Sequence, residues 1–325
     1  MMLRRSVLAI AVLLAASPAF SQGSKAKPKA SAPAQSALPA PTNPGADLAF
    51  GAFQRGHYLT AFAEATKRVE KSDPKAMTLL AELYANGLGV GQDDQKAVEW
   101  YKLAADRGDR EAMFALAMFR LTGRGGAKNR DETARLLAAA ARLGHPAANY
   151  DLALLYLEGQ QFPQDFARAA ELFRNAANAG NPEAQYALGT LYKDGRGVTK
   201  DTREAARLFA AAALAGNLDA RTEYAIMLFN GEGVAKDEAG AGNLFLKAAQ
   251  RGSPIAQNRL ARMLATGRGL AADPVQAIKW HLVAKAGGAG DRFLDEFVQK
   301  QSADTRAGGE KEAKPWLALI AASRS

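Results

Sequence analysis

Residues that could carry catalytic chemistry are few in this sequence. It contains three histidines, His57, His145 and His281, and no cysteine. No histidine pair or cysteine set has the spacing of a zinc site, and no Gly-x-Ser-x-Gly elbow is present. We therefore expect no catalytic residue, no metal site and no cofactor, and we predict that the chain is not an enzyme.

Glycine-rich turns are the second candidate for chemistry, because such turns can cradle phosphate groups. A phosphate loop follows a strand, whereas these turns recur without one, at a fixed step of 36 residues. The first glycine of each turn is Gly87, Gly123, Gly159, Gly195, Gly231 and Gly267. Six copies at one step indicate structural turns, in which glycine adopts the left-handed backbone that ends a helix.

Carboxylates at the same step have a structural explanation as well. The residues that open the second helix of each repeat are Asp93, Asn129, Asp165, Asp201, Asp237 and Asp273. All are Asp or Asn, the types preferred at a helix N-cap, so we interpret them as caps rather than acid–base pairs. His145 stands at the N-cap of a first helix, and His281 stands at a packing position that Phe173, Phe209 and Phe245 fill in other repeats.

These caps and turns delimit two helices in each repeat. In the fourth repeat, the spacing predicts a first helix over 182–193 and a second helix that starts at Asp201. Small residues equivalent to Ala81 and Ala104 recur in every repeat, and apolar residues recur at three- and four-residue spacing. No segment alternates with period two. We predict an all-α solenoid of helix–turn–helix repeats with a 36-residue period.

The run YALGTLYKDGRGVTKDTREAARLFAAAALAG, residues 186–216, resembles the Sel-one-like repeat family, a relative of the tetratricopeptide repeats. The resemblance covers six copies over residues 75–290. It implies a right-handed α/α superhelix that serves as a non-enzymatic scaffold for protein–protein contacts, frequently in bacterial envelopes. Arg120 replaces a tyrosine of the pattern, and repeat three lacks the second glycine of its turn; local drift and a ligand-adapted loop both explain these departures.

The two ends of the chain differ from the repeats. Residues 1–21 combine Arg4 and Arg5, an apolar run and a small-x-small site, which predicts a cleavable signal peptide without a lipid-anchoring cysteine. Residues 22–47 are rich in Ala, Pro, Ser and Lys and are typical of a disordered linker. We expect residues 48–74 to form an N-terminal capping helix, and residues 291–325 to form C-terminal capping helices in which Pro315 makes a turn.

Composition narrows the expected setting and partners. The formal net charge is +9, but basic residues are spread through every repeat, and an exported protein rarely meets DNA, so we expect no nucleic-acid partner. After the signal peptide, no apolar run is long enough to span a membrane. We expect a monomer in the periplasm or outside the cell, with an unidentified protein partner.

The face of each first helix that points away from the second helix would hold such a partner, by analogy with tetratricopeptide arrays. Repeats two, three and five are apolar there, and a wide exposed apolar strip indicates a partner. Our candidate binding residues are Phe114, Met118, Arg120, Leu121, Tyr150, Leu154 and Leu157, unless tight coiling buries them. The resulting hypothesis is an envelope scaffold that binds a protein segment and regulates an envelope or signalling partner. The alternative is a peptidoglycan- or glycan-binding protein, or a weak cell-wall hydrolase, using a polar cleft around Arg120, Tyr156 and Tyr192.

Overall fold

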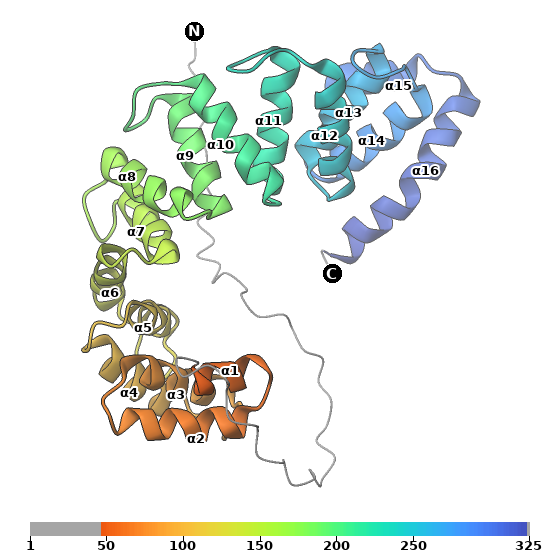
Figure 1. Cartoon of the computed structure of the whole chain (residues 1–325). Helices are drawn as coiled ribbons and strands as arrows, with labels where there is room; N and C mark the ends of the chain where they lie inside the picture. The colour runs from red at the N-terminus through yellow and green to blue at the C-terminus, as the bar shows by residue number, and fades with distance from the viewer. Residues whose placement is uncertain (1–46, 324–325) are drawn as a thin grey trace, which may run out of the picture. The chain divides into compact units, whose positions relative to one another are not determined.

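The computed structural model describes residues 47–323, and within that range it contains sixteen α-helices and no strand (Figure 1). The prediction of an all-α solenoid of helical pairs is therefore confirmed. The helices form two compact units. The N-terminal unit ends at Gln164, and the C-terminal unit begins at Asp165. The predicted signal peptide and residues 22–46 of the predicted linker lie outside the described residues.

The N-terminal unit contains two short leading helices and then successive repeat helices. Its helices are α1 (Leu48–Gln54), α2 (Tyr58–Val69), α3 (Pro74–Asn86), α4 (Asp94–Ala105), α5 (Arg110–Thr122), α6 (Arg130–Arg142) and α7 (Pro146–Glu158). Helices α3 and α4 pack as a pair, as do α5 and α6.

The C-terminal unit continues the pattern and ends in a longer helix. Its helices are α8 (Phe166–Asn178), α9 (Pro182–Asp194), α10 (Thr202–Leu214), α11 (Leu218–Asn230), α12 (Glu238–Gln250), α13 (Pro254–Thr266), α14 (Pro274–Ala286), α15 (Arg292–Gln299) and α16 (Ala303–Ala322). None of the sixteen helices in the described range is long and apolar enough to cross a membrane.

Local chemistry explains where the repeat helices begin and end. Every predicted cap of a second helix accepts a hydrogen bond from a backbone N–H two or three residues later, as Asp201 does from Glu204 at 3.0 Å. The backbone N–H of Asp201 itself donates to the Tyr192 carbonyl at 3.0 Å, which ties the cap to the preceding helix. The predicted turn glycines, with Gly195 at φ 70°, all adopt the left-handed conformation after a first helix.

Small residues let the helices of each repeat approach closely. Ala81 and Ala104, with their equivalents in the other repeats, are fully buried. At Gly189, a Cβ atom would lie only 2.8 Å from the Phe209 ring, so the glycine makes room for a large core side chain. The core positions predicted for Phe209 and its equivalents are confirmed, and His281 fills the same position at 1% exposure.

The N-terminal cap differs from the expectation. Asp47 caps α1 by accepting from the Phe50 N–H at 3.0 Å. A single helix was predicted over residues 48–74, whereas two helices form there, because Gly56 adopts the left-handed conformation, with φ 77°, in the turn between them. Arg68 pairs with both Asp47 and Asp73, the N-cap residues of α1 and α3, and so fastens α2 between its neighbours.

The C-terminal cap also differs. Pro315 was predicted to form a turn, but it lies inside the continuous helix α16. Ala313 is fully buried and the Trp316 ring lies 5.0 Å from the Trp280 ring, so packing on α14 holds both sides of the proline in helical conformation. The expected contact of the tail with the last repeat therefore forms at Trp316, while Leu319 remains 68% exposed.

Candidate protein-binding groove

A groove of about 750 Å³ opens in the N-terminal unit, along the first helices of the repeats. It is lined from α3, α5 and α7 by residues that share one helical stripe, at spacings of three, four and seven. These are Lys75, Thr78, Leu79 and Glu82 on α3; Glu111, Phe114, Ala115 and Met118 on α5; and Ala147 and Asp151 on α7. The lining is completed by Ala76 on α3, by the N-cap residues Asp47, Asp109 and His145, and by residues of α1, α2 and α4 such as Phe50, Arg68 and Tyr101. The groove is thus a product of the repeat, with side chains that differ from one repeat to the next.

Two carboxyl groups in this groove lack a cationic partner. Within residues 47–323, neither the Glu82 nor the Asp151 carboxylate forms an ion pair. Burial raises the pKa of Glu82, and the nearby Glu111 adds to the rise. Burial raises the pKa of Asp151 to about 7, with His145 offsetting part of the effect. Unpaired, partly buried carboxyl groups in a concave site are the groups that a cationic ligand would stabilise in their ionised form.

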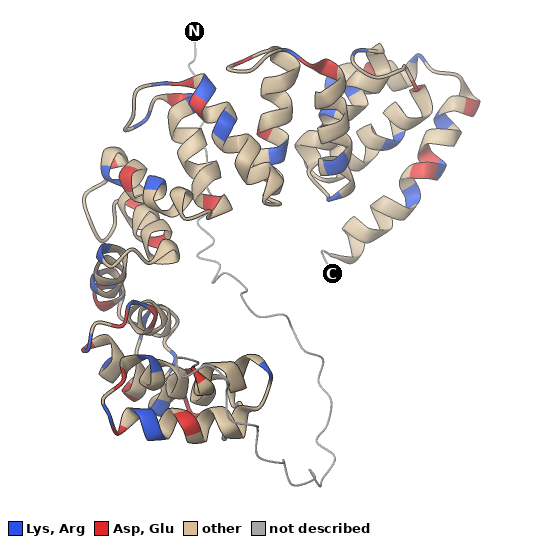
Figure 2. Cartoon of the chain, in the orientation of Figure 1, with Lys and Arg blue, Asp and Glu red and all other residues tan. Residues whose placement is uncertain are grey.

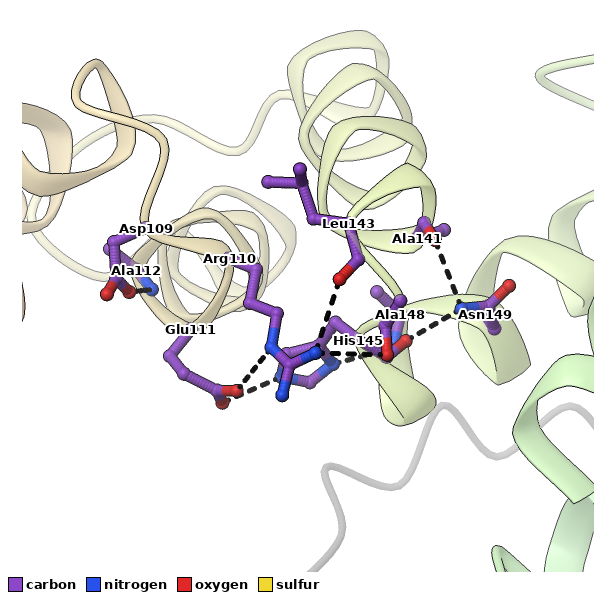
Figure 3. Close-up of polar contacts among 10 residues, drawn as sticks. Asp109, Arg110, Glu111, Ala112, Ala141, Leu143, His145, Ala148 and Asn149 are labelled. Atoms are coloured by element: carbon purple, nitrogen blue, oxygen red, sulfur yellow. Dashed lines mark hydrogen bonds and ion pairs between the residues drawn. The ribbon is translucent and has the colours of Figure 1, made fainter. Parts of the chain in front are cut away.

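His145 connects the groove wall to the fold (Figure 3). Its Nδ1 accepts the Ala148 N–H at 3.1 Å, which makes it the N-cap of α7 as the sequence predicted. Because Nδ1 accepts, Nε2 carries the proton and donates to Glu111 Oε2 at 2.9 Å. This hydrogen bond is the main reason that the pKa of Glu111 lies below its usual value. The imidazole also stacks on the Phe114 ring, with 4.4 Å between ring centres.

A second set of contacts holds Glu111 and His145 in place. Arg110 Nε donates to Glu111 at 3.2 Å, and Arg110 Nη1 donates to the Leu143 carbonyl at 3.2 Å (Figure 3). Asn149 donates to the His145 carbonyl at 2.9 Å. Glu111 is therefore held by hydrogen bonds before any ligand arrives, which lowers the entropy lost on binding.

The predicted binding residues divide into two sets. Phe114 and Met118 line the groove. Arg120, Leu121, Tyr150 and Leu157 are partly exposed but do not line it, and Leu154 is only 5% exposed. Leu154 was a candidate for the exposed strip unless tight coiling buried it, and it is buried. A binding role for the partly exposed residues stays a prediction.

The alternative polar cleft has different local contacts. Arg120 pairs with Glu132 at 3.0 Å, and the Tyr156 ring stacks on Phe162 with 4.8 Å between centres. The Tyr192 hydroxyl accepts from Arg174 at 3.0 Å. Arg120, Tyr156 and Tyr192 thus each contact a different side chain near their own position in the repeat array. A shared polar cleft around them stays a prediction.

Sequence reasoning missed Asp151 and Glu111, because the predicted stripe began one turn too late along each first helix. The prediction followed positions equivalent to 78, 82 and 85, whereas the groove follows those equivalent to 75, 78, 79 and 82. A varied set of side chains at 79, 115 and 151 was the available signal, since structural positions keep one residue type. Within the described range, no cluster of three metal-binding side chains occurs.

The helical pairs, their caps and their turns define a solenoid of short α-helical repeats. The sequence profile described as the Sel1 repeat matches six consecutive segments, over residues 74–109, 110–145, 146–181, 182–217, 218–253 and 254–288. Because these segments make up more than half of the chain, the protein belongs to the Sel1 repeat family. Proteins of this family generally act as non-catalytic scaffolds for protein–protein interaction.

Solved structures support the same assignment. The chain is similar to a Sel1 repeat protein from Oxalobacter formigenes, at 26% identity and a TM-score of 0.62, over 73% of this chain and 94% of that one. It is also similar in fold to a protective antigen of uropathogenic Escherichia coli that displays an SLR fold. That likeness has 24% identity and a TM-score of 0.59, over 82% of this chain and 65% of that one. A search of curated proteins found no match.

Proposed function

We propose that this protein is a non-enzymatic scaffold of the bacterial envelope, and that the groove of its N-terminal unit binds a basic, amphipathic segment of a partner protein. The observation that carries this proposal is the pairing of an apolar wall with two partly buried carboxyl groups, Glu82 and Asp151, that form no ion pair in the described residues. A ligand that supplies positive charge would stabilise this pair in its ionised form.

Charge complementarity favours a basic ligand. The groove lining contains five carboxylates and two permanent cations; the carboxylates are Asp47, Glu82, Asp109, Glu111 and Asp151, and the cations are Arg68 and Lys75. Arg68 is already shared by two aspartates. An opposite charge at about 4 Å is worth about 4 kcal/mol at an effective dielectric constant of 20. Part of that gain offsets the desolvation of the ligand's own charge.

The apolar wall requires that the ligand be amphipathic. Phe50, Phe114 and Met118 present carbon surface beside the acids, and burial of such surface contributes about 25 cal/mol per Å². Methionine adapts to differently shaped side chains, which suits a site for protein segments. Lysine or arginine alternating with leucine or phenylalanine on one face of a helix matches both features.

Acidic and basic residues are interspersed along the helices of each unit (Figure 2). The net charge of +9 therefore gives little information about a given cavity. The local surplus of carboxylates is what selects a basic segment in the groove.

A binding experiment tests the proposal directly. The mature chain is titrated into a fluorescein-labelled amphipathic peptide of Lys and Leu, and into the same peptide with Glu in place of Lys, with anisotropy as the readout. The basic peptide should bind, and the double substitution Glu82→Gln with Asp151→Asn should weaken it about tenfold or more, since two charge contacts are lost.

The matched control is Glu70→Gln with Asp106→Asn, which removes two exposed carboxylates of the same unit that do not line the groove. It should change the affinity less than twofold. Equal binding by both double variants, or stronger binding of the acidic peptide to the groove, would overturn the proposal. Saturable binding to purified peptidoglycan that neither double variant affects would favour the glycan-binding alternative.

The envelope location rests on residues 1–21 and has its own test. A reporter enzyme that is active only after export, fused behind residue 47, should be active in bacterial cells. Replacing Arg4 and Arg5 by glutamate should reduce that activity, because the charged start of a signal peptide aids its export. An inactive reporter, with the fusion protein uncleaved in the cytoplasm, would contradict the proposed location.

A further inference from the structure

A second cavity, of about 390 Å³, lies in the C-terminal unit, and the charge of its lining is opposite in sign to that of the groove. We call it the arginine pocket. Its lining includes Phe229 on α11, Arg259, Arg262 and Met263 on α13, Arg268 in the turn after α13, and Phe293 on α15. Three arginines and no carboxylate are in this lining, around five apolar side chains.

Two of the three arginines are held in place by carboxylates that do not line the pocket. Arg262 donates from Nε and Nη2 to the two carboxylate oxygens of Asp291, at 2.5 and 2.9 Å. Arg268 donates to Glu238 at 2.5 Å. Each guanidinium also lies over an aromatic ring, Arg262 over Phe293 at 5.1 Å and Arg268 over Phe229 at 4.6 Å. The cationic and aromatic surfaces of the pocket are therefore ordered in advance.

The third arginine has no such partner. Arg259 is exposed, and it forms no ion pair or hydrogen bond with any residue in the described range. Glu238 is also shared, since Lys236 lies 2.9 Å from the same carboxylate that Arg268 contacts. Positive charge therefore exceeds negative charge at this site, and Arg259 is the group left to receive an anion.

The site extends beyond the pocket itself. A neighbouring depression of about 340 Å³ shares Arg259 and Arg262 with it and adds Ile255, Asn258 and Asp291. Ile255 is 54% exposed. An extended ligand could therefore pass over Arg259 with one side chain in the pocket and its neighbours in the depression.

We propose that the arginine pocket binds an acidic segment of a partner protein, with a carboxylate on Arg259 and an adjacent aromatic or long aliphatic side chain between Phe229, Met263 and Phe293. A guanidinium presents two parallel N–H donors that match a carboxylate, and the planar rings accept an apolar side chain. Nucleic acid fits less well. A phosphate backbone needs a row of unpaired cations, whereas two of these three arginines are already neutralised.

The inference is independent of the proposed groove in the N-terminal unit, because it uses other residues and the opposite ligand charge. The test begins with a phage-displayed library of random twelve-residue peptides selected on the mature chain. Selected sequences are synthesised with fluorescein and titrated with wild type and with Arg259→Glu. The library should yield a group of peptides that combine Asp or Glu with Phe, Trp or Leu, and Arg259→Glu should weaken these peptides at least tenfold.

Lys247→Glu is the matched control. Lys247 is exposed on α12 of the same unit and does not line the pocket. Its replacement by glutamate changes the charge by the same amount as Arg259→Glu does. It should alter the affinity less than twofold, and the milder Arg259→Gln should lie between wild type and Arg259→Glu. Circular dichroism of each variant checks that the helices remain folded.

Three outcomes would overturn the inference. The first is a selection without acidic, apolar peptides, and the second is acidic peptides that bind Arg259→Glu and wild type equally. The third is a fluorescein-labelled single-stranded DNA 20-mer that binds more tightly than any selected peptide and is weakened by Arg259→Glu. Acidic peptides that bind normally to the Glu82→Gln, Asp151→Asn protein would show that the pocket and the groove act separately. Failure of one proposal thus leaves the other intact.

Discussion

Replacing Asp151 by asparagine should stabilise the protein at neutral pH more than at pH 4. Burial raises the pKa of the Asp151 carboxyl from 3.8 to about 7, and the nearby His145 offsets part of this rise. Between these two pKa values the folded chain binds the proton more strongly than the unfolded chain does, so stability falls as the pH rises. An ion-paired aspartate has the opposite dependence, since its folded-state pKa is depressed.

The size of the effect follows from the shift. One unit of pKa corresponds to about 1.4 kcal/mol, so the ionisable group lowers the free energy of unfolding by about 0.5 kcal/mol at pH 4 and by about 4 kcal/mol at pH 7. The asparagine amide adds a cost of about 1–3 kcal/mol if it stays unpaired, but that cost does not depend on pH. The decisive quantity is the difference in ΔΔG between the two pH values. It should approach about 3 kcal/mol in favour of the variant.

Urea denaturation at pH 4, 5.5 and 7, followed by circular dichroism, measures this difference. The carboxyl ¹³C shift of Asp151 in protein labelled at aspartate gives its pKa in the same samples. Asp106→Asn, at the exposed C-cap of α4, is the control. A constant ΔΔG for Asp151→Asn, or an Asp151 carboxyl that titrates near pH 4, would refute the reasoning.

Three further predictions concern the groove, a turn and the core. Binding of the basic peptide should strengthen about tenfold from pH 6 to pH 8 as Asp151 ionises, and Asp151→Asn should remove most of that dependence; an unchanged dependence would exclude Asp151 as its source. Gly197→Ala should cost about 2 kcal/mol or more, because φ is 70° and a Cβ would lie 2.2 Å from the Phe166 carbonyl carbon. Gly91→Ala, in open space, should be nearly neutral in the same urea denaturation, and equal effects would contradict this account. His281→Phe should stay within about 1 kcal/mol of wild type, since phenylalanine fills the equivalent positions, whereas His281→Ala should cost about 2–4 kcal/mol; a larger loss for Phe than for Ala would contradict it.

The repeat helices could be predicted from the sequence because their boundaries depend on local chemistry. A first helix was expected over 182–193, and α9 covers Pro182–Asp194. The cap at Asp201 and the turn at Gly195 need only a side-chain oxygen and a residue without a Cβ, and both requirements recur six times. Recurrence removed the ambiguity that a single short apolar segment would have had.

The ends of the array could not be predicted in the same way, because they have no equivalents along the chain. Proline inside a helix loses one backbone hydrogen bond and is normally a stop signal. At Pro315 that local preference is overcome by long-range packing, with Ala313 buried and Trp316 against Trp280. The sequence alone does not indicate which distant helix the segment around Pro315 packs against.

The solvent exposure of equivalent residues could not be predicted from the sequence either. Met118 and Leu154 occupy the same position in successive repeats, and a pattern-based argument treats them alike. Met118 lines the groove, whereas Leu154 is 5% exposed. The difference depends on which helices approach each position, and periodicity contains no information about that approach.

The two cavities are nevertheless lined by residues at equivalent positions of the repeat. Stepping by 36 residues from Leu79 leads through Ala115, Asp151, Ala187 and Glu223 to Arg259. Four of these six residues line a cavity: Leu79, Ala115 and Asp151 line the groove, and Arg259 lines the arginine pocket. The same position thus holds the acid Asp151 in one cavity and the base Arg259 in the other. The adjacent step that starts at Glu82 ends at Arg262, again an acid in one cavity and a base in the other. Caps, turn glycines and small core residues fix the backbone in each repeat, so a side chain at these positions changes the charge of a cavity at little cost to the fold. In such a repeat, variation at a fixed position on the cavity side of the first helix is therefore better evidence of ligand contact than apolar character is.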